Sequence, residues 1–348
     1  MIINLDNCEY SDKNGMYGGA AGDKDGIIYD GCNWLIKYPK YIGDMERTGG
    51  AIYSTSPLSE YIGSHIFSIL GFPTHETMLV ERKSKIAVAC RDLENDEEHL
   101  IELRTLKNHQ NEEMMTRMGI EFHSTGSNHV VDIDELFLHL ENNDILKNIP
   151  GIRQRFWEQA VVDIFINNND RNNGNWGIIR CKGKPDRVAP VFDNGGCMQT
   201  KLSEEKIARL LKDPDLIKKN ALNTQTAYGK EGHAFSSKKF LETFFDEEEL
   251  RNALVSVVPK IKSNMGIIQE FISNIDEKHV LSNGEECIVC SNNRKSMYTM
   301  QIQARYNNLL LPYYEKAITR KQCVEIDMKD DVSKGFDPIN KCKHRGRI

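Results

Sequence analysis

Short apolar runs of strand length dominate the first third of the chain. Two of them flank a turn at Asp30 and Gly31, and two more flank a second, charged turn. Between the two pairs, Ser56 and Pro57 are typical of a helix start, and apolar residues recur at helical spacing until Gly71. The pattern predicts a small sheet with one helix. The predicted strands lie at residues 27–29, 34–38, 77–80 and 86–90.

Beyond Arg91 the apolar positions recur mostly at helical spacing. A strand pair is expected at 176–180 and 188–192, whereas residues 110–128 are polar with little pattern and are expected to form a long loop. Helices are predicted at residues 134–146, 152–165, 203–212, 238–258, 267–275 and 299–318.

The change of pattern near residue 92 predicts an α+β fold with two lobes. We expect a small, β-rich lobe over residues 1–92, a larger helical lobe over residues 93–320, and a loosely ordered tail over residues 321–348. A chain of 348 residues is long enough to bury two lobes that face a cleft.

The charge and hydropathy of the chain narrow the function classes. A net charge of −6 without a basic block argues against a general nucleic-acid binder and against binding to anionic membranes. No run of about 18 apolar residues occurs, and the first ten residues lack the regions of a signal peptide. We expect a cytoplasmic protein, from a low-GC bacterium in view of its many Asn, Lys and Ile residues, with delivery into a host cell as an open alternative.

One pair of loops carries most of the chemical information. Asp170 and Asn175 lie five residues apart in a polar turn behind an apolar run, and Asp193 follows a later apolar run. Kinases use this layout to align an acceptor hydroxyl and to hold magnesium on ATP. Asp170 is therefore the candidate to orient the hydroxyl or accept its proton, and Asn175 and Asp193 are the candidate magnesium ligands.

The N-terminal third supplies candidates for binding the phosphates of ATP. Lys37 ends an apolar strand, where its ammonium group could reach the alpha and beta phosphates. Glu60, in the first turn of the following helix, could pair with Lys37 and fix its direction. Either residue alone could equally be an ordinary solvated side chain. The evidence for a shared site is the order of the five residues along the chain: Lys37, Glu60, Asp170, Asn175 and Asp193.

Two further segments could contact the nucleotide. The stretch 17–26 is rich in small residues, so that its backbone amides could approach phosphate oxygens; its candidates are Gly18, Gly19, Gly22 and Lys24. It matches neither the Walker pattern nor the Gly-rich loop of protein kinases, and a flexible hairpin is an equal alternative. The segment around Cys90 and Asp92 would pass between the lobes, where its backbone could hydrogen-bond adenine.

Other interpretations stay open for these residues. Each loop could be only a polar turn, because Asn, Asp and Gly are common turn residues. A pseudokinase or nucleotide-binding signalling module would keep the fold without catalysis, although all five polar positions are present. A lipid or small-molecule kinase would use the same parts on another hydroxyl, although the chain lacks a convincing basic amphipathic face for lipid access.

The cysteines suggest a weaker alternative. The chain has nine, an odd number mostly scattered along it, which favours reduced thiols over a disulfide framework. Cys287 and Cys290 are the exception, because they could bind zinc together with Cys323, Cys342 and His344 in a zinc-dependent interaction protein. The second half of that set lacks the close pairing of a structural zinc site.

With these motifs in view, the chain resembles the HipA-like serine/threonine kinases, especially their short, stand-alone CtkA-like branch. The resemblance implies a two-lobed protein-kinase-like fold that uses ATP and magnesium to phosphorylate Ser or Thr of a protein, including itself. It also implies that Lys37 contacts ATP, that Asp170 is catalytic, and that Asn175 and Asp193 bind magnesium. The matching motifs are WLIKYP at 34–39, SEYI at 59–62, WEQAVVD at 157–163, NDRNNGN at 169–175 and APVFDNG at 189–195.

The chain departs from that family at three points. Asn172 stands where the HipA toxins usually carry His, and its amide can still make a structural hydrogen bond. The stretch 18–26 contains no Ser or Thr, so the phosphorylatable serine of the toxins is missing. Phosphate-loop sequence begins within the first twenty residues, so we expect no extra N-terminal module and hence neither an antitoxin partner nor direct nucleic-acid contact.

Overall fold

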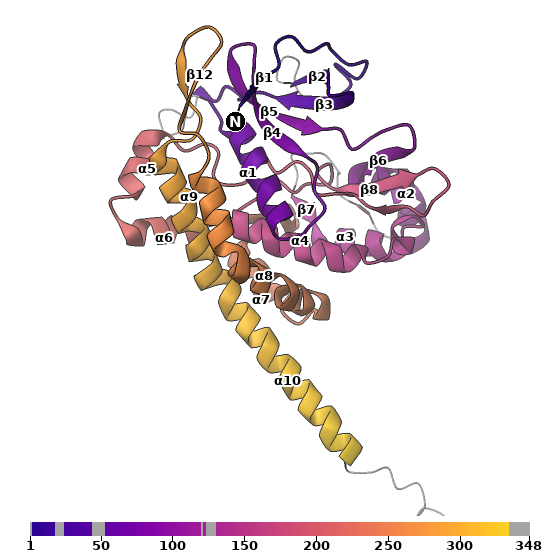
Figure 1. Ribbon diagram of the computed structural model, residues 1–348. Coiled ribbons are helices and arrows are strands. Elements are labelled where there is room, and N and C mark those ends of the chain that lie inside the picture. The colour runs from indigo at the N-terminus through magenta and orange to yellow at the C-terminus, as the bar shows by residue number, and fades with distance from the viewer. Residues whose placement is uncertain (1, 18–23, 44–52, 120, 123–129, 334–348) are drawn as a thin grey trace, which may run out of the picture.

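The protein folds into a small sheet-containing lobe above a larger, mainly helical lobe (Figure 1). A computed structural model describes residues 2–17, 24–43, 53–119, 121–122 and 130–333, with side chains up to residue 322. This arrangement is the α+β, two-lobed fold that the change of sequence pattern predicts. In the described part of the chain, no helix is both long enough and apolar enough to span a bilayer.

The upper lobe is built on a five-stranded sheet in the order β1-β4-β5-β3-β2. Its strand pairs are antiparallel, except for the parallel pair of β1 and β4. Helix α1 (Ser56–Ile69) begins with Pro57 in its first turn and packs against β4 and β5. The four strands and the helix predicted here are confirmed. The strands are β1 (Ile3–Asn4), β2 (Lys24–Tyr29), β3 (Cys32–Lys37), β4 (Thr77–Arg82) and β5 (Lys85–Arg91).

The lower lobe is organised around helix α4 (Ile152–Ile166), whose side chains are buried on nearly every face. Trp157 and Phe165 of α4 are fully buried, and α4 packs along helix α8 (Glu248–Ser273). The other helices are α2 (Leu103–Met118), α3 (Ile133–Asn142), η2 (Leu146–Asn148), α5 (Glu204–Leu210), α6 (Pro214–Leu222), α7 (Ser237–Thr243), α9 (Asn292–Arg305), η3 (Tyr306–Leu310) and α10 (Leu311–Ser333).

Short strands in the described part of the chain form the further sheets β6-β8-β9 and β11-β10-β7 and the hairpin of β12 and β13. The central pair, β6 and β8, joins the segment after β5 to the segment after the Asp170 loop, so it brings these two regions together. The strands are β6 (Glu98–Glu102), β7 (Val131–Asp132), β8 (Gly177–Cys181), β9 (Arg187–Val188), β10 (Gln225–Lys230), β11 (His233–Ser236), β12 (Lys278–Val280) and β13 (Glu286–Ile288).

The expected loop at 110–128 is wrong over its first part, because α2 extends to Met118 and ends at Gly119 in the left-handed conformation. The buried positions of α2 do follow helical spacing, but two of the five are Lys107 and Gln110. Polar residues on the buried face therefore hide the apolar period from the sequence. Residues 120 and 123–129 lie outside the described part.

Other elements also differ from prediction. The expected helix 238–258 is two helices, α7 and α8, and α8 continues through Pro259 to residues that were expected to form a separate helix. Packing of α8 against α4 and α10 holds it intact where the proline would favour a break. Helix α10 reaches Ser333 and projects from the lobe, so residues 321–333 are helical instead of loosely ordered (Figure 1). The hairpin of β10 and β11 was not predicted.

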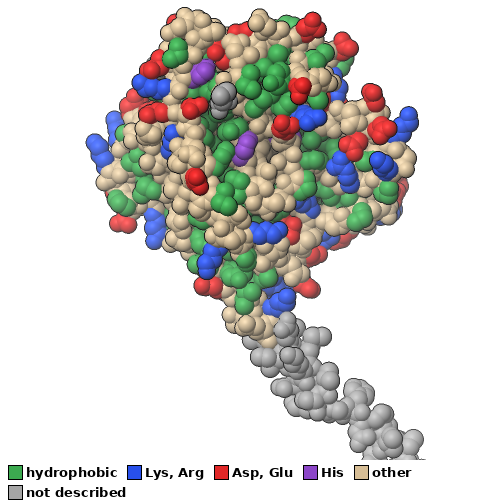
Figure 2. Space-filling view, in the orientation of Figure 1, with side chains coloured by type: hydrophobic (Ala, Val, Ile, Leu, Met, Phe, Trp, Pro, Cys, Tyr) green, Lys and Arg blue, Asp and Glu red, His purple; other side chains and the backbone are tan. Residues whose placement is uncertain are grey.

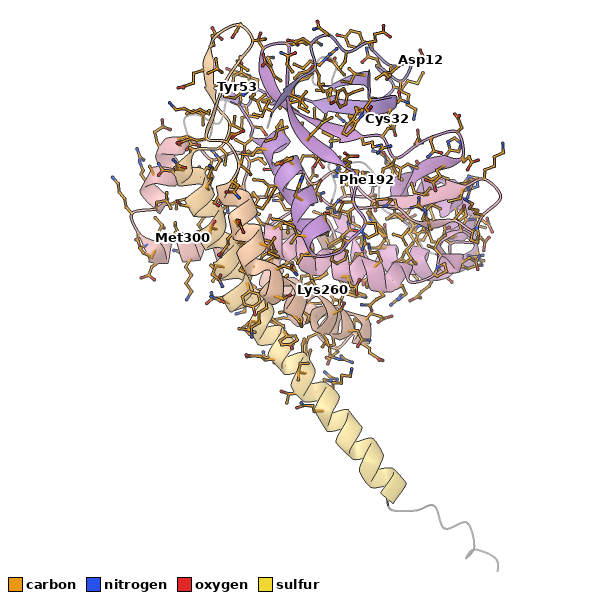
Figure 3. All side chains as sticks on the ribbon, viewed as in Figure 1. Asp12, Cys32, Tyr53, Phe192, Lys260 and Met300 are labelled. Atoms are coloured by element: carbon orange, nitrogen blue, oxygen red, sulfur yellow. The ribbon has the colours of Figure 1, made fainter. Side chains whose placement is uncertain are left out.

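Acidic and basic side chains are interspersed on the face of the molecule in Figure 2. This distribution is ordinary for a surface of mixed charge. The charge distribution on this face therefore does not mark a binding site. The cavity that Phe192 helps to line lies between the lobes (Figure 3).

Candidate active site

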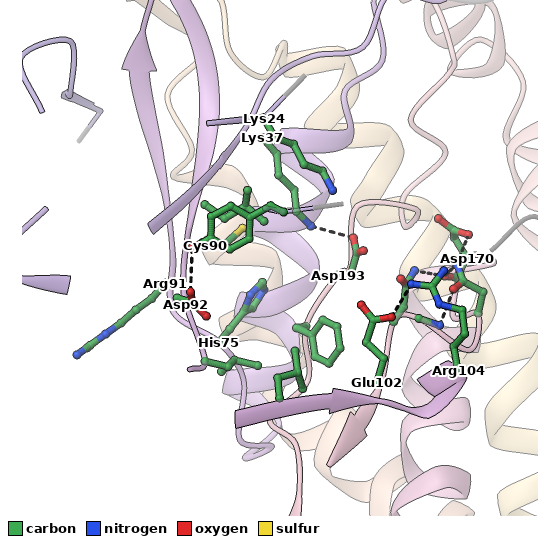
Figure 4. Close-up of a pocket in the computed structure, with 18 of the residues that line it drawn as sticks. Lys24, Lys37, His75, Cys90, Arg91, Asp92, Glu102, Arg104, Asp170 and Asp193 are labelled. Atoms are coloured by element: carbon green, nitrogen blue, oxygen red, sulfur yellow. Dashed lines mark hydrogen bonds and ion pairs between the residues drawn. The ribbon is translucent and has the colours of Figure 1, made fainter. Parts of the chain in front are cut away.

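A cavity of about 770 Å³ opens between the two lobes and receives side chains from both (Figure 4). The upper lobe contributes strand ends and the segment after β5, and the lower lobe contributes the two polar loops after α4 and after β9. Among the residues that line it are Tyr17, Lys24, Lys37, Cys90, Asp92, Glu102, Arg104, Asp170, Asn172, Asn175, Phe192 and Asp193.

Lys37, at the end of β3, joins two carboxylates from different parts of the chain. Its Nζ lies 2.8 Å from Oε2 of Glu60 and 2.9 Å from Oδ1 of Asp193. Burial by itself would lower the pKa of Lys37, but the charges of Asp193 and Glu60 outweigh it and hold that pKa well above its usual range. The expected pairing of Lys37 with Glu60 is therefore present, and Lys37 is charged.

Glu60 is fully buried on α1 and has partners for both carboxylate oxygens. Its Oε2 pairs with Nζ of Lys37. Its Oε1 accepts a hydrogen bond of 2.8 Å from the backbone N–H of Asn194 and lies 3.1 Å from Nε2 of His75. Burial would raise the pKa of Glu60, but Lys37 and His75 hold it well below its usual range. Glu60 thereby connects the upper lobe directly to the loop that carries Asp193.

His75 is a site residue that the sequence did not reveal. It is buried before β4, and Nε2 also lies 3.0 Å from the hydroxyl oxygen of Ser64. Ser64 in turn accepts a bond of 2.9 Å from the side-chain amide of Asn194. His75 therefore helps to orient Glu60 and the loop after Phe192. A lone histidine before a strand gives no local pattern that predicts this role.

Asp170 lies in the turn after α4 and faces the cavity with its side chain. Protein atoms surround the carboxyl group closely enough that partial loss of solvation raises its pKa, although a hydrogen bond from Asn172 opposes the shift. That bond joins Nδ2 of Asn172 to Oδ1 of Asp170 at 3.1 Å, and Oδ1 of Asn172 accepts from the N–H of Gly174 at 2.8 Å. Asn172 thus keeps a structural hydrogen bond, as expected.

Arg171, adjacent to Asp170 in the sequence, points away from the cavity and is completely buried. Its guanidinium group binds the Asp163 carboxylate on α4 through bonds of 3.0 and 3.1 Å. It also donates to the carbonyl of Asn175 at 2.9 Å, to the carbonyl of Phe192 and to the side chain of Asn194. One side chain therefore joins the Asp170–Asn175 loop to the Asp193 loop and both to the central helix.

Asp193 has a backbone φ of 56°, in the left-handed region that non-glycine residues rarely adopt. The surrounding bonds hold it there: Arg171 bonds the residue before it, and Glu60 accepts from the N–H of the residue after it. Strain of this kind persists where neighbouring contacts determine the conformation, often at functional sites. The strain turns the Asp193 carboxylate toward Lys37 and the cavity.

Asn175 and Asp193 fit a magnesium ion in their ligand chemistry. Nδ2 of Asn175 donates to the Asp170 carbonyl, which directs its amide oxygen elsewhere. Both residues line the same cavity, and Arg171 approaches the Asn175 carbonyl at 2.9 Å and the Asp193 carbonyl at 3.4 Å. Carboxylate and amide oxygens are the ligand types that magnesium prefers. The two predicted ligands therefore line one cavity, and their role as magnesium ligands stays a prediction.

The opposite end of the cavity is formed by the end of β5 and the segment that follows it. Cys90 is buried there, and burial raises the pKa of its thiol, so it is protonated. The carboxylate of Asp92 accepts bonds of 2.8 Å from both Lys13 and Tyr17. Lys24 also lines the cavity. Of the remaining candidates, Gly18, Gly19 and Gly22 lie outside the described residues.

The zinc alternative has less support. Among the described residues, one group of three side chains has ligand atoms close enough together for a metal ion, namely Glu60, His75 and Cys90, but Lys37 already takes Glu60. Cys287 and Cys290 are free thiols in the part of the chain that the structure describes. Their proposed partners Cys342 and His344, and the side chain of Cys323, lie outside it.

Comparisons with known proteins concern the sequence and the fold of the whole chain. No protein-family model matches the chain. The serine/threonine-protein kinase CtkA of Helicobacter pylori strain J99 is 26% identical over 260 residues, which cover 74% of this chain and 75% of CtkA. The crystal structure of the H. pylori proinflammatory kinase CtkA superimposes with a TM-score of 0.75 at 24% identity, over 92% of this chain and 99% of that one.

A second solved structure shares the fold more distantly. HipA of Shewanella oneidensis MR-1, solved with HipB and operator DNA, superimposes with a TM-score of 0.50 at 12% identity over 88% of this chain and 68% of HipA. The two-lobed fold of this chain is thus the fold of CtkA and HipA. The chain is thus similar in sequence to the serine/threonine-protein kinase CtkA, and it shares its fold with CtkA and HipA.

Proposed function

We propose that the protein is a magnesium-dependent kinase that transfers the gamma-phosphoryl group of ATP to Ser or Thr of a protein. The observation that carries the proposal is the convergence of Lys37, Asp170, Asn175 and Asp193 on one cavity between the lobes. These residues are separated by up to 156 positions, which is the separation of Lys37 from Asp193. Lys37 and Asp193 pair directly, and Asp170 and Asn175 line the same cavity, which is the arrangement that binding of ATP with magnesium next to an acceptor hydroxyl requires.

The residues divide the work as phosphoryl transfer requires. Lys37, fixed by Glu60, binds the phosphates of ATP, and the segment from Cys90 to Asp92 lies at the end of the cavity that suits adenine. Asn175 and Asp193 would hold magnesium, which would supply positive charge to the phosphates. Asp170 orients the acceptor hydroxyl and accepts its proton as the hydroxyl oxygen bonds to the gamma-phosphorus and the bond from that phosphorus to ADP breaks. The boundary between the nucleotide lobe and the catalytic lobe lies at residues 92/93, after β5 ends at Arg91.

The partner in this proposal is a protein substrate. The assembly with HipB and operator DNA is a property of the HipA structure. For this chain we propose neither an antitoxin nor direct contact with nucleic acid, because the net charge is −6 and acidic and basic groups are interspersed on the visible face. We further propose that the protein works in the bacterial cytoplasm.

The test is phosphate transfer from radiolabelled ATP, with magnesium, to a generic protein substrate and to the protein itself. Wild type should label at least one acceptor, and Asp170→Ala should abolish labelling, because acid–base assistance and alignment of the hydroxyl are both lost. Asp170→Ala should still bind magnesium and ATP, which a thermal-shift titration measures. Equal labelling by wild type and variant would refute the assignment, and ATP binding without transfer to any acceptor would identify a nucleotide-binding module instead.

A further inference from the structure

Arg104, in the first turn of α2, is a cavity residue without a role in the proposed chemistry. The start of α2 is attached directly to the catalytic loop: the backbone N–H of Arg104 donates to the Asn173 carbonyl at 2.7 Å, and that of Leu103 donates to the Trp176 carbonyl at 2.9 Å. The position of Arg104 relative to Asp170 is therefore set by the backbone of the catalytic loop itself.

The catalytic loop leaves room for this side chain at Gly174. A Cβ atom built on Gly174 would lie 3.3 Å from Nη2 of Arg104 and 3.2 Å from Oδ1 of Asn172. The guanidinium group thus lies over the glycine, next to the residue whose amide holds the Asp170 carboxylate. Figure 4 shows Arg104 beside Asp170, with Glu102 next to Arg104.

The bonding of Arg104 differs from that of Arg171. Arg171 is fully buried, and its bonds connect fixed parts of the fold. The side chain of Arg104 is 37% exposed and pairs through Nη2 with Glu102, itself 34% exposed, at 2.6 Å. A pair this exposed is weak and exchanges easily. A guanidinium group also carries five N–H donors, which is more than one carboxylate can occupy.

We propose that Arg104 binds an anionic side chain of the protein substrate, next to the hydroxyl that is phosphorylated. The proposal rests on the proposed kinase function and names its substrate class: Ser or Thr residues flanked by Asp, Glu or an already phosphorylated residue. Because Arg104 lines the cavity over Gly174, next to the Asn172 amide that holds the Asp170 carboxylate, it lies on the Asp170 side of the cavity, which we call the acceptor side. Planar guanidinium groups bind carboxylate and phosphate through paired hydrogen bonds, which suits both chemistries. Glu102 holds the guanidinium group in place until the substrate anion replaces it.

The test compares serine peptides that differ only in the residues flanking the serine: Asp, phosphoserine, Ala or Lys. For wild type we expect the KM of the anionic peptides to be about tenfold below that of the alanine peptide, as one charge-assisted hydrogen-bonded pair would give. Arg104→Gln should remove this difference with the KM for ATP unchanged, and Arg104→Glu should favour the lysine peptide. Glu102→Gln should lower the KM of the anionic peptides by about twofold, because a weak competitor is lost. The Asp and phosphoserine arms show which anion is preferred.

Arg180→Gln is the matched control, because Arg180 is another exposed arginine, on β8, that pairs with a carboxylate, that of Asp186, and is not among the residues lining the cavity. It should leave the peptide preference unchanged. The same peptides, labelled with a fluorophore, are also titrated by anisotropy in the presence of ADP and magnesium, so that binding is measured without phosphate transfer.

Two results would overturn the proposal. One is an equal affinity of wild type for anionic and alanine peptides. The other is a loss of kcat in Arg104→Gln that is the same for every peptide, because that pattern would place Arg104 on the transferring phosphoryl group. Anisotropy that shows the anionic preference without any transfer would uphold the role of Arg104 in binding and refute the kinase proposal instead.

Discussion

The two sides of the cavity are built in opposite ways. On the nucleotide side, Glu60 and Arg171 are fully buried and bonded on several sides, and Asp193 is held in a strained conformation. On the acceptor side, Asp170 is exposed to the cavity, and Glu102 and Arg104 form a pair that is about one-third exposed. The nucleotide is the same in every turnover, whereas acceptor segments vary. A rigid arrangement of side chains suits the nucleotide, and side chains that can exchange partners suit the acceptor segment.

The energetics of the two sides differ accordingly. An exposed ion pair contributes about 0–1 kcal/mol, because water and salt screen it and both side chains lose freedom. A buried pair is different, since removal of one partner leaves an uncompensated charge at a cost of about 3–5 kcal/mol. If the comparison is correct, substitutions on the nucleotide side should destabilise the protein, and those on the acceptor side should change substrate recognition.

The largest effect should come from Arg171→Ala. This change leaves the Asp163 carboxylate buried without its partner and removes the bonds to the carbonyls of Asn175 and Phe192. We expect the free energy of unfolding to fall by about 3–5 kcal/mol, measured by urea denaturation. Arg104→Ala is the control from the acceptor side and should lose no more than about 1 kcal/mol.

A double variant makes this prediction sharper. Replacement of both charges, Arg171→Met with Asp163→Leu, should recover part of the stability, because no unpaired charge is left inside the protein. It should not recover phosphate transfer, since the carbonyls of the two loops still lack their common donor. Equal losses of stability in Arg171→Ala and Arg104→Ala would refute the contrast between the two sides.

The second prediction concerns Gly196, which lies against the catalytic aspartate. A Cβ atom here would lie 2.7 Å from Cβ of Asp170 and 3.0 Å from Oδ1 of Asn168, so the Asp170 turn would have to move. We expect Gly196→Ala to lower kcat by about 10²-fold, as small misplacements of catalytic groups do, with the KM for ATP little changed. The neighbouring Gly195→Ala is the control, because its nearest contact would be an ordinary 3.4 Å. Similar kcat values for both variants would mean that Asp170 does not need its present position.

The third prediction concerns His75. Its replacement by Ala removes a partner from the buried carboxylate of Glu60 and from Ser64, so we expect a loss of about 1–3 kcal/mol in the free energy of unfolding. The KM for ATP should rise as well, because Glu60 orients Lys37. His75→Gln keeps an N–H donor and should lose less on both measures. A loss of stability with an unchanged KM for ATP would show that His75 supports only the fold.

The sequence predicted the residues that lie next to strong local patterns. Lys37 ends an apolar strand, Glu60 opens a helix with Pro57, and Asp170 and Asn175 occupy a polar turn behind the long apolar run of α4. Local pattern fixes where such residues stand along the chain. The pattern identifies such residues even when the two that meet, such as Lys37 and Asp193, are 156 positions apart in the sequence.

The sequence could not predict residues whose importance arises from long-range packing. Arg171 lies inside the recognised motif, yet nothing in its neighbours shows that it is buried and reaches Phe192 and Asn194. Arg104 gave even less indication of a role than Arg171, because it lies in the first turn of α2. The buried face of α2 includes Lys107 and Gln110, so the apolar pattern did not predict this helix. Both errors have one cause: burial of polar side chains leaves no apolar period.

The smallest effect is expected at Gly174, where the two sides of the cavity meet. Its backbone φ is not in the left-handed region, so alanine is allowed, but the new Cβ would press on Arg104 at 3.3 Å and on Asn172 at 3.2 Å. Arg104 is the more flexible neighbour and should move. We expect Gly174→Ala to raise the KM of an anionic peptide by about two- to fivefold, since one exposed contact is displaced, with the KM for ATP unchanged. In an Arg104→Ala background the same substitution should have no effect on peptide KM, and that double-mutant cycle isolates the contact. A fall in kcat that persists in the Arg104→Ala background would instead place the strain on Asn172 and hence on Asp170, which would make Gly174 part of the rigid arrangement.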